Sequence, residues 1–78
     1  MTADAEQTAD TLQQVIDTVD RIESDDPSTF DRGEDFLCDI RDKAQDMLSA
    51  IEERGTVTEK QASTADNWLA GVSKWDHS

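Results

Sequence analysis

The chain has 78 residues, and its 19 acidic side chains outnumber seven basic ones, which gives a net charge of −12. This length predicts one small domain with a thin core, since such a domain buries only about 60–65% of the surface of its unfolded chain. The charge argues against direct binding to nucleic acid or to an anionic membrane, because both need a basic patch that the sequence lacks.

The sequence lacks the features of secreted and membrane proteins, which indicates where in the cell the protein is found. Cys38 is the only cysteine, so no disulfide can form within the chain, and this fits a reducing environment. The first residues, MTADAEQTAD, lack the basic start and apolar run of a secretory signal. No apolar run is long enough to span a bilayer. We therefore expect a cytoplasmic protein without membrane contact.

The kind of acid is also informative, because Asp is used more than Glu and only three lysines occur, at Lys43, Lys60 and Lys74. This composition resembles that of proteins from salt-in halophilic archaea and their viruses. In molar salt the Debye length falls to about 3 Å, so the repulsion between the carboxylates is largely screened. An acidic mesophilic protein, such as a nucleic-acid mimic, stays open as the alternative.

The first predicted element is a helix over residues 4–23, because apolar residues recur there at helical spacing on one face. These residues are Leu12, Val15, Ile16, Val19 and Ile22. Residues 24–33 break this pattern: Pro27 disfavours helix in the residue before it, and Gly33 suits a loop or a weak helix start. Ser28 or Thr29 is a candidate cap for a following turn. We expect a hydrated connection here.

The second predicted helix covers residues 34–54 and has an apolar stripe wide enough to face two neighbours. Gly55 follows it as the expected C-terminal cap. Thr58 and Gln61 match a capping box, with Val57 as the hydrophobic residue before it, so a third helix is expected over 59–75. The prediction is an all-α, three-helix bundle formed by one domain over 1–78. Residues 1–8 and 76–78 are expected to fray, and a homodimer is one possible assembly.

The third helix carries four candidate residues for binding a partner, namely Trp68, Gly71, Trp75 and Lys60. Glycine inside a helix costs about 1 kcal/mol relative to alanine, a cost that is tolerated where another backbone must approach closely. Tryptophan is enriched in binding hot spots. The alternative is structural, with Trp68 in the core and Trp75 covering the open end of the bundle.

A row of acids follows the second helix at helical spacing, roughly opposite its apolar stripe. It consists of Asp35, Asp39, Asp42 and Asp46. The structural interpretation is a solvated face. The functional one is mimicry of nucleic-acid phosphates, since four helical residues rise about 6 Å.

Nothing in the sequence indicates catalysis. His77 is the only histidine and stands one residue from the end, and neither it nor Cys38 has sequence partners for a zinc site or an activated nucleophile. We expect no enzyme activity, no cofactor and no metal.

The stretch from Phe36 to Trp68 resembles a segment of assorted phage and archaeal-virus proteins, in which an aromatic residue and a helix precede G-x-[LV]-[ST]-x-K-Q. The matching residues here are Phe36, Gly55, Val57, Thr58, Lys60 and Gln61. The resemblance implies a viral or mobile-element origin and a connection to DNA metabolism, and it carries no catalytic residue across.

These observations lead to three hypotheses. The first is a non-enzymatic protein–protein interaction module of a halophile or its virus, binding another protein or a second copy of itself. The second is an acidic nucleic-acid mimic that inhibits a DNA-binding protein. The third is an accessory to a DNA replication or recombination enzyme.

Overall fold

The computed structural model describes residues 4–76, and helices make up almost all of this range. They are α1 (Ala5–Asp25), α2 (Pro27–Arg32), α3 (Glu34–Arg54) and α4 (Glu59–Asp76). The all-α class is confirmed. The expected count of three helices is wrong, because the segment predicted as a hydrated connection contains the short helix α2. The three long helices lie within two residues of their expected bounds.

The short helix α2 forms because Asp26 caps it, and neither Ser28 nor Thr29 does. The Asp26 carboxylate accepts hydrogen bonds from the Thr29 backbone N–H at 3.4 Å and from the Thr29 hydroxyl at 2.6 Å. Pro27 takes the first helical position, where its missing N–H costs nothing. Thr29 and Phe30 are buried, so α2 adds to the core and closes one end of the molecule.

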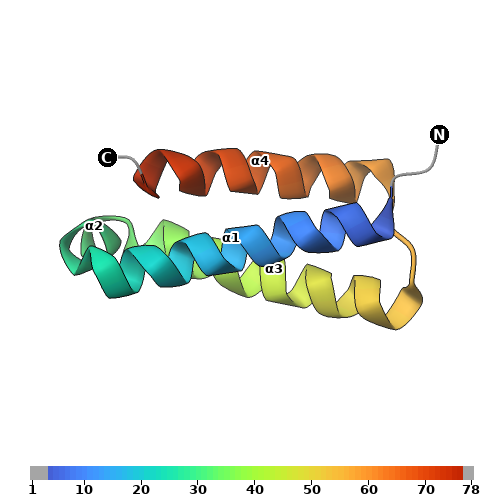
Figure 1. Cartoon of the computed structure of the whole chain (residues 1–78), viewed down its shortest axis with the longest axis horizontal. Coiled ribbons are helices and arrows are strands. Elements are labelled where there is room, and N and C mark those ends of the chain that lie inside the picture. The colour runs from blue at the N-terminus through green and yellow to red at the C-terminus, as the bar shows by residue number, and fades with distance from the viewer. Residues whose placement is uncertain (1–3, 77–78) are drawn as a thin grey trace.

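Helix α1 is the central element of the bundle. It packs along both α3 and α4 and lies between them in Figure 1, antiparallel to α3 and parallel to α4. Among the five largest fully buried side chains, three belong to α1 and only one each to α3 and α4. These residues are Leu12, Val15, Val19, Leu37 and Val72. The core therefore consists of the α1 stripe and the sides of α3 and α4 that face it.

The link between α3 and α4 follows the predicted stop and start. Gly55 has the left-handed φ of 73°, and its N–H bonds the Ile51 carbonyl. The Thr58 N–H donates to the Gln61 side-chain oxygen at 3.0 Å, while the Gln61 N–H donates to the Thr58 hydroxyl at 3.1 Å. Both halves of the capping box are thus confirmed. Despite this short antiparallel link, α3 and α4 approach each other at few positions.

The two ends of the described range are held by polar contacts. The Asp4 side chain accepts from the Glu6 N–H, which caps α1, and Thr8 is buried. At the other end, Asp76 accepts from Arg21 of α1 through both carboxylate oxygens. Fraying of residues 1–8 and 76–78 stays a prediction. Residues 1–3 and 77–78, including His77, lie outside the described residues.

Candidate interaction surface

The side of the bundle where α3 and α4 face each other is marked by an aromatic pair. The rings of Phe36 and Trp75 lie with centroids 6.3 Å apart and planes tilted by 39°. The Phe36 ring also lies over Gly71, where a Cβ would stand 3.3 Å from its Cζ. These contacts establish which faces of α3 and α4 are turned toward each other near the start of α3 and the end of α4.

Helical periodicity extends these two faces along the bundle. Met47 follows Phe36 by about three turns, and Trp68 precedes Trp75 by about two turns, so each continues the line of its aromatic neighbour. Met47 and Trp68 are only half-buried and pack against the edge of the core. We call this surface the α3–α4 seam. Its members are Phe36, Lys43, Met47 and Arg54 on α3, and Lys60, Thr64, Trp68, Gly71 and Trp75 on α4.

All four candidate partner residues thus fall on one side of α4, where their surroundings within the chain differ from one another. Gly71 does not leave room for another backbone, because the Phe36 ring of the same chain fills the space above it. Trp75 packs onto Phe36 and Gly33 and is half-buried. Trp68 lies at the edge of the core rather than inside it, and Lys60 is exposed.

The acidic row on α3 is exposed at all four of its positions, Asp35, Asp39, Asp42 and Asp46. Asp39 bonds Lys43 one turn further along at 2.9 Å, and both side chains are 58% exposed. An exposed pair of this kind contributes about 0.3–0.5 kcal/mol. The row is therefore a solvated face that borders the α3–α4 seam and leaves its carboxylates accessible.

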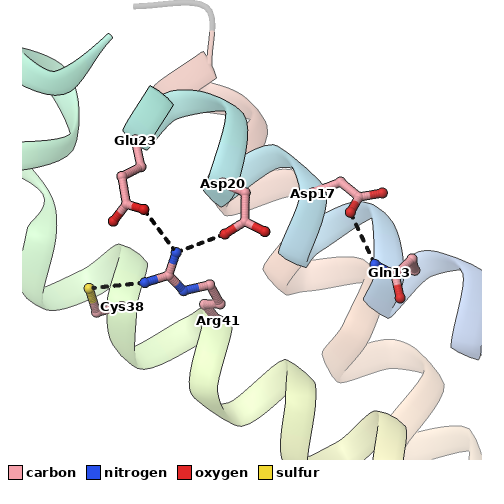
Figure 2. A network of polar contacts seen from close by, with 6 residues as sticks. All are labelled: Gln13, Asp17, Asp20, Glu23, Cys38 and Arg41. Carbon is pink, nitrogen blue, oxygen red and sulfur yellow. Dashed lines mark hydrogen bonds and ion pairs between the residues drawn. The ribbon is translucent and has the colours of Figure 1, made fainter. Parts of the chain in front are cut away.

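A different polar cluster, centred on Arg41, joins α3 to α1 and α2. Its Nη1 donates to Asp20 at 2.8 Å and lies 3.6 Å from a Glu23 oxygen, while Nη2 lies 3.9 Å from the Cys38 sulfur. Figure 2 shows Asp20 and Glu23 on α1 pointing toward the guanidinium on α3. The guanidinium carbon is also 6.0 Å from the centre of the Phe30 ring on α2.

This environment favours the charged form of Arg41. The hydrogen bond to Asp20 raises the pKa of the Arg41 guanidinium above its usual range, and the charge of Glu23 adds to the effect despite partial burial. Arg41 is not among the residues for which the sequence predicts a role. The available signal was two acids one turn apart on the first helix and an arginine on the next. That signal becomes specific only when the pairing of the helices is known.

Shallow hollows open to solvent on the surface of the part of the chain that the structure describes. One, of about 530 Å³, lies between α1 and α4 beside the Arg21–Asp76 pair. The other, of about 300 Å³, lies beside Gly33, Phe36 and Trp75. Within residues 4–76, no three His, Cys, Asp or Glu side chains gather as a metal site would require. No helix of this range is long and apolar enough to cross a membrane.

Comparison with protein-family models, with curated proteins and with solved structures finds no significant match to this chain. The function is therefore argued from the chain's own surface.

Proposed function

We propose that this chain is a non-enzymatic protein–protein interaction module that binds through the α3–α4 seam. The observation that carries the proposal is the incomplete cover of α3 and α4. Their fully buried side chains belong to the core, while Met47 and Trp68 pack against the edge of that core and remain partly open to solvent. Tryptophan is enriched in binding hot spots, and methionine is enriched in the cores of protein–protein interfaces.

A halophilic archaeon or its virus is the proposed source. Every Asp and Glu of the chain except Asp76 is exposed, so nearly all of the negative charge lies at the surface. Such a surface holds water and cations in concentrated salt, whereas in dilute buffer its self-repulsion opposes the compact state. The partner of such a protein must bind in concentrated salt. Salt screens long-range attraction between charges but leaves apolar contacts intact.

The test is capture of a partner from a halophilic lysate in molar KCl, with matched variants of neighbouring residues. Trp68→Ala removes a seam side chain, while Leu69→Ala removes a half-buried side chain on the α1-facing flank of the same helix. We expect one defined protein to be retained by the wild type and by Leu69→Ala, and to be lost with Trp68→Ala. Circular dichroism must show equal helicity for all three. Equal capture by both variants would refute the role of the seam.

The identity of the captured protein distinguishes the third hypothesis. A replication or recombination enzyme that retains the chain, combined with no gel shift of bare DNA, would support the accessory role. This role derives from the resemblance of the capped helix pair to segments of viral proteins. If the captured protein has no connection to DNA metabolism, the accessory hypothesis is refuted and the interaction module itself still stands.

Mimicry of a nucleic acid is the second candidate function, and the exposed row of acids on α3 favours it. If the row imitates phosphates, Asp39→Lys combined with Asp42→Lys should abolish inhibition of a DNA-binding target while helicity is unchanged. Inhibition equal to that of the wild type would exclude mimicry by this row. The seam variant Trp68→Ala should leave such inhibition intact, which separates the two modes of binding.

A further inference from the structure

The α3–α4 seam is bordered by opposite charges on its two helices. On α4 the basic residues lie on the seam side: Lys60 precedes Gly71 by about three turns, and Lys74 follows it by about one. The acids Glu59 and Asp66 point about 120–140° away from the Gly71 direction, because each residue turns the helix by about 100°. This edge of α4 is therefore basic in a chain that is otherwise strongly acidic.

The edge of α3 that borders the seam has the opposite sign. Asp39 and Asp46 are about two turns apart and lie about 60–80° from the line of Phe36 and Met47, on the side away from the core. Both are exposed. The Lys43 partner of Asp39 is held only by an exposed pair, so Asp39 can exchange it for another cation at little cost.

The levels of these charges along the bundle also correspond. Because Phe36 lies beside Gly71 and Trp75, and α3 and α4 are antiparallel, Lys74 stands near the level of Asp35, about one turn from Asp39. By the same count, Lys60 stands about one turn from the level of Asp46. Each basic residue on α4 thus has an acidic counterpart within about one turn of its height on α3, on the far side of an apolar strip.

We infer that the seam is the interface between two copies of this chain, related by a two-fold axis that runs along it parallel to the helices. Such an axis places α3 of one copy beside α4 of the other, and these neighbours are antiparallel as in a four-helix bundle. The basic edge then meets the acidic edge twice. Met47 and Trp68 of both copies fill the centre.

A second copy fits this surface better than an unrelated protein for two reasons. An isologous interface must be self-complementary, and a strip with one acidic and one basic border has this property. In addition, three of the seven basic residues belong to the seam and a fourth borders it, namely Lys43, Arg54 and Lys60, with Lys74 at its edge. These charges reduce the repulsion between two copies of net charge −12 that approach through this side.

The inference rests on the proposed interaction module and names its partner. It is tested by light scattering under reducing conditions, so that a disulfide through Cys38 plays no part. The salt is the lowest KCl concentration at which wild type is fully helical. We expect a wild-type dimer. The variants Lys60→Glu/Lys74→Glu and Asp39→Lys/Asp46→Lys should each have a dissociation constant at least about tenfold higher, because unlike pairs become like pairs.

An equal mixture of the two double variants is the decisive sample, because its mixed dimer has unlike charges along both edges again. We expect it to dimerise with close to wild-type affinity. The control Asp10→Lys/Asp66→Lys changes the net charge as much as Asp39→Lys/Asp46→Lys but lies off the seam, and it should leave the dimer intact. Failure of the mixture to recover association, with all variants helical, would overturn the inference.

A monomeric wild type also overturns this inference, and the capture experiment then decides about the proposed function. If a different protein is still captured and is lost with Trp68→Ala, the interaction module stands with another partner. If no partner depends on Trp68, both proposals fail.

Discussion

The indole ring of Trp75 occupies the space where a side chain at residue 33 would stand. A Cβ on Gly33 would lie 3.0 Å from Cη2 and Cζ3 of the indole, and Gly33 itself is buried. The C-terminal end of α4 is thereby packed against the junction between α2 and α3. Trp75 thus joins elements more than forty residues apart in the chain.

Gly33→Ala should therefore destabilise the fold by about 1–3 kcal/mol, because the added methyl group must displace a large ring. Its backbone φ of −111° is open to any residue, so the loss comes from the steric contact and not from strain. Urea unfolding followed by circular dichroism measures the change.

Gly71→Ala is the matched control. Its Cβ meets only the half-buried Phe36 ring at 3.3 Å, and the gain of about 1 kcal/mol in helix propensity offsets the contact. Equal losses for both variants would contradict the special role of Trp75.

Gly55→Ala should cost about 1–2 kcal/mol for a different reason. Nothing lies within 4 Å of a Cβ at this position, so space is not limiting, but the φ of 73° is unfavourable for alanine. Gly55→Asn should recover part of the loss, because asparagine tolerates the left-handed conformation better. Thermal unfolding of the three proteins side by side provides the measurement. If alanine and asparagine lose the same amount, conformation is not the cause.

Arg41→Met should lower the free energy of unfolding by about 1 kcal/mol, since it breaks the pair with Asp20 and the contact with Phe30 but keeps the aliphatic stem. Lys43→Met is the control, because its pair with Asp39 is more exposed and should cost under about 0.5 kcal/mol. Denaturant titrations at low and high KCl should show the Arg41 effect shrinking with salt. An equal cost for the two variants would show that Arg41 does not link the helices.

The surroundings of Asp26 predict that its contribution to fold stability changes only at acidic pH. The hydrogen bonds from the Thr29 hydroxyl and backbone N–H, together with the charge of Arg32, lower the pKa of the Asp26 carboxyl below its ordinary value of 3.8. A lowered folded-state pKa stabilises the fold above the ordinary pKa, and this contribution is lost as the pH falls through the folded-state value.

The melting temperature of wild type should therefore exceed that of Asp26→Asn near neutral pH, and the difference should shrink as the pH falls below 3.8 and through the lowered pKa of Asp26. Asparagine still accepts a hydrogen bond as a cap, so the difference reports the charge. A gap that stays constant down to acid pH would refute this assignment.

Salt should raise the helicity of the whole chain, because a net charge of −12 on so small a core is poorly tolerated without screening. We expect circular dichroism to show a loss of helix below a few tenths molar KCl. A spectrum that is unchanged between about 0.05 and about 3 M KCl would remove the argument for a halophilic source.

The limits of what the sequence reveals are clearest at α2 and at the seam. Asp26-Pro27 reads as a helix break, and it does end α1, yet the same aspartate also caps the next helix. A six-residue helix has too few apolar positions to show a helical period in the sequence. Only the structure shows that α2 forms and that it buries Thr29 and Phe30. A glycine inside a helix, such as Gly71, indicates a close neighbour, but only the tertiary structure shows that the group above it is the Phe36 ring of the same chain.

The sequence by itself determined the helical class, the bounds of α3, the stop at Gly55 and the start at Thr58, because periodicity and capping depend on residues within one or two turns. Tertiary structure alone decided that α1 is the central helix, that Arg41 meets Asp20 and Glu23, and that Phe36, Trp75 and Gly71 lie together. These contacts join residues on different helices. They form only because the apolar faces of α1, α3 and α4 pack into one small core, and a pattern within a single helix does not predict that packing.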